Sequence, residues 1–215
     1  MIEPVDFLVS CLQQLPSTFR PGEMAYLALT SKAEHPFRDK LAFSLYERLP
    51  RDRYIVSREW TARGAGGKTK RVDLAVLNPT GRPVCLLELK AMYSFDVAEK
   101  YAARTEADEI DALSSAEDCP TVLSLLLATH PKGEIPRSLR GVIKYDSGIN
   151  SARRKLGSHE LVRENVVKSV ACAYGQRQPV FQGNFDAGSA FGFRHRSRDD
   201  LLACGSDRRV GLKLS

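Results

Sequence analysis

The chain has 215 residues, enough for a single domain, residues 1–215, with a substantial hydrophobic core. Its 32 basic and 26 acidic residues leave a formal net charge of +6, which is compatible with a nucleic-acid partner. The five cysteines form no C-x-x-C pair, which argues against a zinc site and a disulfide framework and favours a reducing, cytoplasmic compartment. The first residues lack a signal-peptide pattern, and no apolar run approaches the ~20 residues of a membrane span, so we expect no association with membranes.

Three helices are predicted before the first strand. Residues 5–15 and 22–32 read as short amphipathic helices. The third helix begins near Pro36, which fits a first helical turn, and ends before Pro50. Its buried stripe is predicted to consist of four apolar residues at helical spacing: Phe37, Leu41, Leu45 and Leu49.

Glu34 precedes this third helix and is a candidate functional residue. It lies seven residues before Leu41, so it falls on the apolar stripe if the helix extends that far back. Its alternative role is structural, because a carboxylate near a helix N-terminus interacts favourably with the helix dipole. Glu47 is the second candidate, but it points away from the stripe, where an exposed charge is ordinary.

A strand over residues 53–61 is followed by a glycine-rich basic loop over residues 63–71. We expect this loop to be a flexible hairpin tip. Lys68 and Lys70 are its candidates for contacts with a nucleic-acid backbone.

The same loop imitates a nucleotide-binding motif. Residues 62–69 match a relaxed P-loop pattern, A-x-x-x-x-G-K-T. A true P-loop leads into a helix whose N-terminus holds phosphate, whereas the residues that follow here, 72–77, are strand-like. Nucleotide hydrolysis is therefore the third choice among the functions considered.

The stretch from Arg71 to Ala91 reads as a β-hairpin. Residues 72–77 are apolar and rich in β-branched side chains, residues 78–81 carry the turn sequence Asn-Pro-Thr-Gly, and residues 84–91 return. The short connection predicts antiparallel pairing.

Three charged residues interrupt this apolar hairpin. Side chains alternate along a strand, so Glu88 and Lys90 share one face, and the hairpin can bring Asp73 beside them. Burying such charges costs free energy unless they pair with each other or bind a metal ion. The pattern therefore predicts either a functional site or a structural ion pair of Glu88 with Lys90 or Arg71.

The functional alternative is a metal site for phosphodiester hydrolysis. The Asp73 and Glu88 carboxylates offer hard oxygen ligands for Mg²⁺, with Mn²⁺ as a substitute, and the backbone carbonyl of Leu89 could be a third. Such a cation polarises the phosphate and activates a water molecule. Lys90 could orient or deprotonate that water, or neutralise charge on the phosphate.

Asp73, followed after fourteen residues by Glu88-Leu89-Lys90, resembles the D…(D/E)-x-K signature of the PD-(D/E)xK nuclease superfamily, which has the restriction-endonuclease-like fold. The resemblance implies an α/β core in the order helix, three strands, helix, strand. It also implies an accessory glutamate on the first core helix, for which Glu34 is the candidate.

The flanking sequence is compatible with that order. Residues 95–117 read as a long helix and residues 121–129 as an apolar strand, so the predicted elements of residues 36–129 follow the family order. RecB-like members of the superfamily carry a Q-x-x-x-Y motif on the second helix. This chain has Val97 where the glutamine would stand and Tyr101 at its end, which departs from that subfamily.

The remaining sequence is less regular. We expect a fifth strand over Gly141–Tyr145, a basic helical segment over residues 150–174 and short strands over residues 180–196. Arg194 and Arg196 are candidates for phosphate contacts, or else exposed charges that protect an edge strand.

Together these features predict a restriction-endonuclease-like core over residues 34–145, an N-terminal helical extension over residues 1–33 and a β-rich extension over residues 146–215. The predicted function is Mg²⁺-dependent hydrolysis of DNA. A double-strand cut would need a homodimer or two successive nicks, since one core cuts one strand at a time. The alternative is a non-catalytic nucleic-acid-binding protein that keeps the fold.

Overall fold

The computed structural model describes residues 4–31, 33–63, 69–94, 113, 119, 121–131, 135–143, 146–156, 159–174, 179–187, 190 and 206–214. The helical segments in these ranges are α1 (Pro4–Gln14), η1 (Leu15–Thr18), α2 (Glu23–Thr30), α3 (Glu34–Arg48), η3 (Arg137–Leu139), α6 (Asp146–Leu156) and α7 (His159–Tyr174). The strands are β1 (Ile55–Arg63), β2 (Thr69–Leu77), β3 (Pro83–Tyr93), β4 (Val122–Pro131), β5 (Pro179–Asp186) and β6 (Ser206–Leu214).

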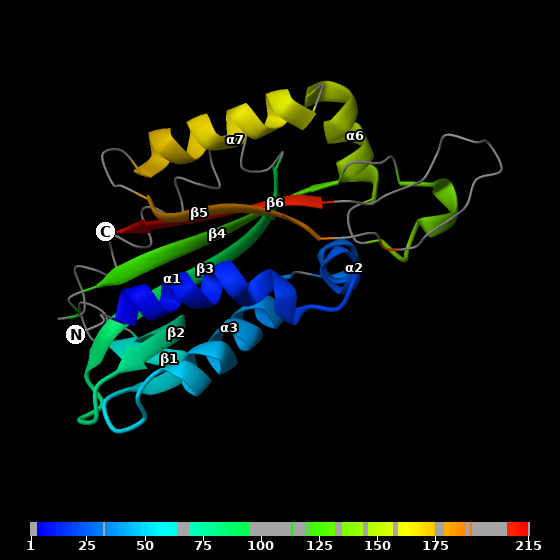
Figure 1. The fold of residues 1–215 in the computed structure, drawn as a ribbon. Coiled ribbons are helices and arrows are strands. Elements are labelled where there is room, and N and C mark those ends of the chain that lie inside the picture. The colour runs from blue at the N-terminus through cyan, green and yellow to red at the C-terminus, as the bar shows by residue number, and fades with distance from the viewer. Residues whose placement is uncertain are drawn as a thin grey trace.

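The strands form one mixed sheet in the order β1-β2-β3-β4-β6-β5 (Figure 1). β1, β2 and β3 make an antiparallel meander, and β4 runs parallel to β3. β6 and β5 extend the sheet with antiparallel pairing. A parallel pair needs a crossover connection, which here spans residues 94–121. The chain is therefore an α/β protein built on a mixed sheet.

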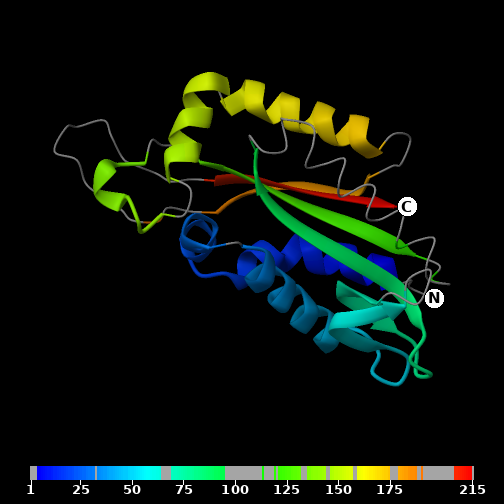
Figure 2. The ribbon, with the colours of Figure 1, turned by 180° about the vertical axis from the view of Figure 1, so that it is seen from behind.

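Helices cover both faces of the sheet. α1 and α3 lie against one face and α7 against the other, and the two opposite views in Figures 1 and 2 agree on this arrangement. On the first face, leucines of β3 and β4 pack with the apolar residues of the N-terminal helices. On the second face, Val166 of α7 packs against Leu126 and Ala128 of β4.

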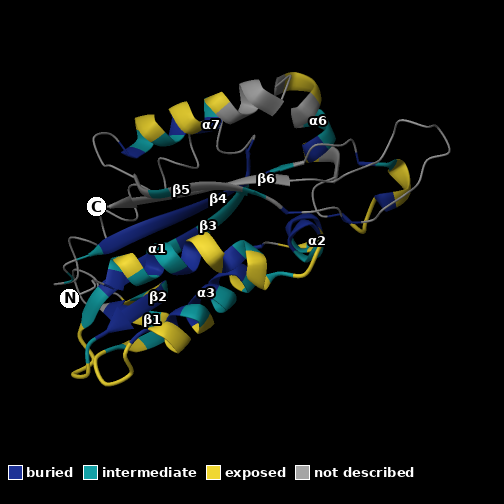
Figure 3. Ribbon diagram, viewed as in Figure 1, coloured by how far each residue is buried: buried dark blue, intermediate teal, exposed yellow. Residues whose placement is uncertain are grey.

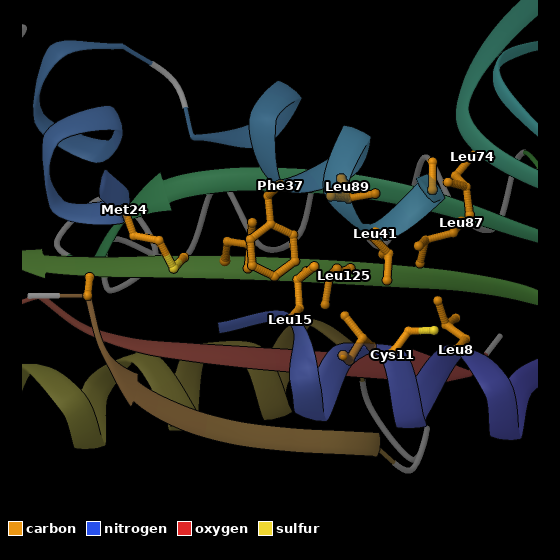
Figure 4. Packing of buried hydrophobic residues seen from close by; sticks show 14 of the residues in the cluster. Leu8, Cys11, Leu15, Met24, Phe37, Leu41, Leu74, Leu87, Leu89 and Leu125 are labelled. Carbon is orange, nitrogen blue, oxygen red and sulfur yellow. The ribbon is translucent and has the colours of Figure 1, made fainter. Parts of the chain in front are cut away.

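α3 owes its position to its apolar stripe. Phe37, Leu41 and Leu45 are buried against the sheet, and Leu49, which follows the helix, is buried as well. Figure 3 shows the buried inner side and exposed outer side of this helix. In Figure 4, Phe37 and Leu41 point toward leucines of β3 and β4. The apolar stripe that the helical spacing predicted is thus the side of α3 that is buried in the core.

Most predicted elements are present, with ends shifted by a few residues. The predicted strand over Gly141–Tyr145 is wrong for residues 141–143. There, Gly141 has a φ of +81° and the N–H groups of Val142 and Ile143 both donate to the Leu139 carbonyl, at 3.0 and 3.1 Å. This closes a turn after η3, because the backbone bonds locally instead of with another strand.

Parts of the remaining predictions fall outside the described residues. Of the predicted helix over residues 95–117, only Leu113 is described, and its backbone is helical. The predicted basic helical segment corresponds to α6 and α7, and β5 coincides with the first predicted strand of the C-terminal region. In the described ranges no helix is long and apolar enough to cross a bilayer.

Candidate active site

The candidate site lies where β2 and β3 stop pairing. On β2 the paired residues run from Leu77 to Leu74, and the register ends with Leu74 opposite Leu87. The N–H of Leu86 donates to the Thr121 carbonyl beside β4, at 2.9 Å. Because N–H groups alternate along a strand, those of Leu89 and the following odd-numbered residues face the opposite edge, toward β2. Beyond Leu87, this edge is no longer covered by the β2 backbone.

Carboxylates take the place of the β2 backbone along this edge. The Leu89 N–H donates to Oδ2 of Asp73 at 2.8 Å. The Ala91 N–H donates to Oε2 of Glu34 at 3.1 Å. One carboxylate comes from β2 and the other from the first residue of α3, so a helix and a strand deliver acids to the same edge of β3.

A backbone irregularity lies across from Asp73. The pairs Arg58–Leu74 and Trp60–Val72 flank the position, so Glu59 of β1 stands opposite Asp73. Glu59 has a φ of +54°, which a residue with a side chain adopts rarely and at a cost of about 1–3 kcal/mol. The sheet is thus locally distorted beside the carboxylate.

The side-chain alternation of β2 changes at Asp73. Leu74 and Val76 belong to the core beneath the N-terminal helices. Strict alternation would place Val72 with them, but Val72 packs with Ala75 on the other cluster. This change lets the Asp73 carboxylate reach both the β3 edge and α3.

Glu88 completes the group of acids. Its Oε2 accepts a long hydrogen bond from the Asp73 N–H, at 3.4 Å, and its Oε1 lies 3.7 Å from Nζ of Lys70. Lys90 lies two residues further along β3, half-buried and on the same face by strand alternation. The structure therefore brings Asp73, Glu88 and Glu34 to one region, with Lys90 on the Glu88 face.

Arg38 of α3 neutralises part of this negative charge. Its side chain is 8% exposed, and one guanidinium nitrogen, Nη1, is ion-paired with Glu59 and lies 3.6 Å from Oδ1 of Asp73. Its Nε lies 3.0 Å from Oδ1 of Asp39. Arg71 adds a second cation to Glu59 at 3.7 Å.

Burial raises the pKa of Asp73 above its usual range. The carboxylates of Glu34 and Glu59 raise it further, while the Leu89 N–H and the Arg38 guanidinium oppose the shift. An ionised Asp73 is therefore electrostatically costly in this place. A cation held by Asp73 would relieve that cost, because an adjacent positive charge favours the ionised form.

The available ligands fit a magnesium ion that also uses substrate oxygens. In the parts of the chain that the structure describes, no three His, Cys, Asp or Glu side chains converge on a metal position. Asp73 of β2 and Glu88 of β3 supply one carboxylate each, and the Leu89 carbonyl is the third protein ligand predicted from the sequence. Mg²⁺ is commonly held by one or two carboxylates, with substrate phosphates and water completing the octahedron.

The predicted nucleic-acid contacts are only partly described. Lys70 lies on β2 with its ammonium group toward Glu88, at the candidate site rather than at the hairpin tip. Lys68, Arg194 and Arg196 lie outside the described residues. The P-loop alternative loses its structural context, since Thr69 begins strand β2 and not a helix.

Sequence reasoning missed Arg38 and Glu59. The sequence does contain a feature that could have identified Arg38: it lies four residues before the buried Ala42, at the border of the apolar stripe of α3. A charge at that border points to a buried partner. No such feature identifies Glu59, since local sequence does not indicate a positive φ at a glutamate.

No protein-family model, curated protein or solved structure matches this chain. What the site can do therefore follows from its own residues.

Proposed function

We propose that this protein is a metal-dependent nuclease of the PD-(D/E)xK type that hydrolyses DNA phosphodiester bonds. One observation carries the proposal: where β2 and β3 separate, the Glu88 carboxylate accepts from the Asp73 N–H and the Asp73 carboxylate accepts from the neighbouring Leu89 N–H. Buried acids cost free energy unless they are paired or bind a metal ion, and a hydrolytic metal site makes use of two carboxylates at such a point.

The arrangement of the elements supports the restriction-endonuclease-like core. α3 precedes an antiparallel meander of β1, β2 and β3, and β4 lies parallel to β3 after a crossover. Apart from the second core helix, of which only Leu113 is described, this is the order that the sequence resemblance implies, and the candidate acids lie on its two central strands and on its first helix.

Each side chain has a role in this proposal. Asp73 and Glu88 hold the cation together with the Leu89 carbonyl, and Glu34 assists as an accessory acid. When bound, Mg²⁺ polarises the phosphate and lowers the pKa of a water ligand. Lys90 orients that water or accepts its proton, and Lys70 neutralises charge on the substrate.

The proposal is tested by incubating the purified protein with plasmid, linear duplex, single-stranded DNA and RNA. Each substrate is incubated with Mg²⁺, with Mn²⁺ and with EDTA. We expect cleavage of DNA with either metal and none in EDTA. Cleavage that persists in EDTA would contradict a metal-dependent mechanism. RNA cleavage without DNA cleavage would contradict the proposed substrate.

A second candidate function is non-catalytic binding of nucleic acid. It is favoured by the ion pairs that the acids make: Asp73 with Arg38 and Glu88 with Lys70. Such pairs can satisfy buried carboxylates without any metal ion. Retained DNA binding with no cleavage of any substrate would select this function over the nuclease.

A further inference from the structure

A cavity of about 360 Å³ opens between the outer side of α3 and strand β1. Its volume falls within the roughly 300–1,000 Å³ typical of small-ligand sites. The cavity combines aromatic, aliphatic and charged side chains, and it is lined by Asp39, Ala42, Phe43, Tyr46, Val56 and Arg58.

Two of these residues are exposed aromatic rings. Phe43 is 59% exposed and Tyr46 is 47% exposed. Their rings are stacked, with centroids 6.3 Å apart and planes inclined by 27°. The Arg51 guanidinium lies over the Tyr46 ring at 4.5 Å. Exposed aromatic side chains gathered at a cavity indicate a binding surface, since their burial on binding is favourable.

A chain of charges links this cavity to the candidate active site. Arg58 lies 3.0 Å from Oδ1 of Asp39, and that same oxygen lies 3.0 Å from Nε of Arg38. Arg38 in turn lies 3.6 Å from Asp73. The cavity wall and the proposed metal ligand are thus two ends of one ion-pair series, which places both where α3 meets β1 and β2.

We infer that this cavity binds an unpaired base of the nucleic-acid strand whose backbone is held at the Asp73–Glu88 site. The inference rests on the proposed function, because the bound strand is the substrate. The rings offer a stacking partner that accepts any base, and Arg58 offers a cation to the adjoining phosphate. Bases within a duplex are stacked on one another, so the ligand is a single strand or an extruded base.

A second copy of the chain would be the other occupant of such a surface. The charges argue against it, since Arg58 and Asp39 line the cavity and Arg51 covers Tyr46. The centres of protein interfaces are depleted of charged residues. Aromatic rings bordered by arginines are instead the combination found on single-strand binding surfaces.

Photochemical crosslinking tests the contact directly. A single-stranded oligonucleotide carrying 5-iodouracil is irradiated with the full-length protein in EDTA, which prevents cleavage, and the modified residue is identified by mass spectrometry. We expect an adduct on Phe43 or Tyr46. Adducts confined to residues outside the cavity would overturn the inference.

Affinity measurements give an independent test. Phe43→Leu and Tyr46→Leu keep apolar volume but remove the ring, and each should weaken binding of the same oligonucleotide by about 5- to 150-fold. The salt slope should stay unchanged, since stacking releases no counterions. Tyr26→Leu is the matched control, because Tyr26 is 51% exposed on α2, away from the cavity. Unchanged affinity in both cavity variants would overturn the inference.

The outcomes separate this inference from the proposed function. If wild-type protein cleaves DNA but both cavity variants bind normally, the base site is wrong and the nuclease stands. If the rings are needed for binding and no substrate is cleaved, the base site stands and the nuclease is wrong. Light scattering tests whether a second copy of the chain occupies the cavity. If wild-type protein is a dimer, and Phe43→Leu or Tyr46→Leu is a monomer with normal oligonucleotide affinity, the cavity serves self-association and the inference is overturned.

Discussion

Arg38 is the residue on which the electrostatics of the site depend. It is 7% exposed and interacts with the carboxylates of Asp39, Glu59 and Asp73. A buried guanidinium loses its hydration, and only such carboxylates can compensate that loss. Arg38 therefore joins α3, β1 and β2 at the point where the sheet is distorted.

Replacing Arg38 by Met should destabilise the fold. The change leaves Asp73 partly buried beside other acids without its cation, and removing one partner of a buried pair costs about 3–5 kcal/mol. We expect about 3 kcal/mol in urea unfolding, since Asp39 and Glu59 are about 40% exposed. Arg53→Met, at an arginine that is 60% exposed, should change stability by less than about 0.5 kcal/mol. Equal stability of the two variants would contradict the role of Arg38.

The raised pKa of Asp73 predicts the sign of a pH effect. Burial puts the folded-state pKa of Asp73 above the ordinary value of about 3.9. Between these two pKa values the folded protein binds the proton more tightly than the unfolded chain. As the pH rises through that window, wild-type protein in EDTA should lose stability relative to Asp73→Asn. The measurement is the free energy of unfolding of both proteins across a pH series.

Asp39 supplies a control of opposite sign. Burial raises its pKa, but hydrogen bonds from Arg38 and Arg58 outweigh this and hold the pKa below its usual range. Wild-type protein should therefore gain stability relative to Asp39→Asn as the pH rises through the lowered folded-state value toward about 3.9. The same sign at both positions would show that the environment of one carboxylate is misassigned.

Lys90 should act on the chemical step and not on metal binding. Lys90→Ala should slow single-turnover cleavage by about 10²–10⁴-fold if the amine takes part in proton transfer. Lys90→Arg should not restore the rate, because the guanidinium remains charged and cannot accept a proton. Full activity in Lys90→Arg would limit Lys90 to a purely electrostatic role.

At the scale of elements, the β2–β3 hairpin positions the acids. Its turn is held by Asn78, whose side-chain oxygen accepts from the N–H groups of Thr80 and Arg82 and from the Thr80 hydroxyl. Gly81 has a φ of +79°, which a side chain disfavours. The turn sets the register of the two strands, and the register brings Asp73 beside Glu88.

Gly81→Ala should therefore weaken the hairpin. A Cβ at Gly81 meets no atom within 4 Å, so the cost comes from the left-handed backbone alone and should be about 1–2 kcal/mol. Gly148→Ala is the matched control, since Gly148 lies in α6 and its added Cβ also meets nothing within 4 Å. That substitution should be neutral or stabilise by up to about 1 kcal/mol in urea unfolding. A stabilising Gly81→Ala would contradict the turn.

Local patterns in the sequence predicted the hairpin and α3, because both elements are determined by residues close together in the chain. The turn residues at 78–81 and the stripe from Phe37 to Leu49 each follow one periodicity. The position of Glu34 as the first residue of α3 also agrees with the helical phase. The positive φ of Glu59 could not be predicted, since no local pattern in the sequence marks it.

At the scale of the whole molecule, the sheet order is only partly readable from the sequence. The core from α3 to β4 follows chain order, so the elements could be placed in advance. The place of the last strand could not: β6 lies between β5, the strand that precedes it, and β4, which is far earlier in the chain. Such non-local pairing leaves no mark in local periodicity. Asp73, Glu88 and Lys90 could be identified from the sequence because they interrupt apolar strands, whereas the ion-pair partners of Arg38 depend on how α3 packs on β1 and β2.

The central claim is that Asp73 and Glu88 together support metal-dependent cleavage, and single-turnover cleavage of labelled DNA in Mn²⁺ tests it most directly. Asp73→Asn and Glu88→Gln are compared with wild-type protein and with Glu47→Gln, which removes an exposed acid of the same α3 helix that carries Glu34. We expect both site variants to fold and bind DNA but to show no cleavage, and Glu47→Gln to cleave at the wild-type rate. Wild-type cleavage by purified Glu88→Gln would contradict the assignment of this site.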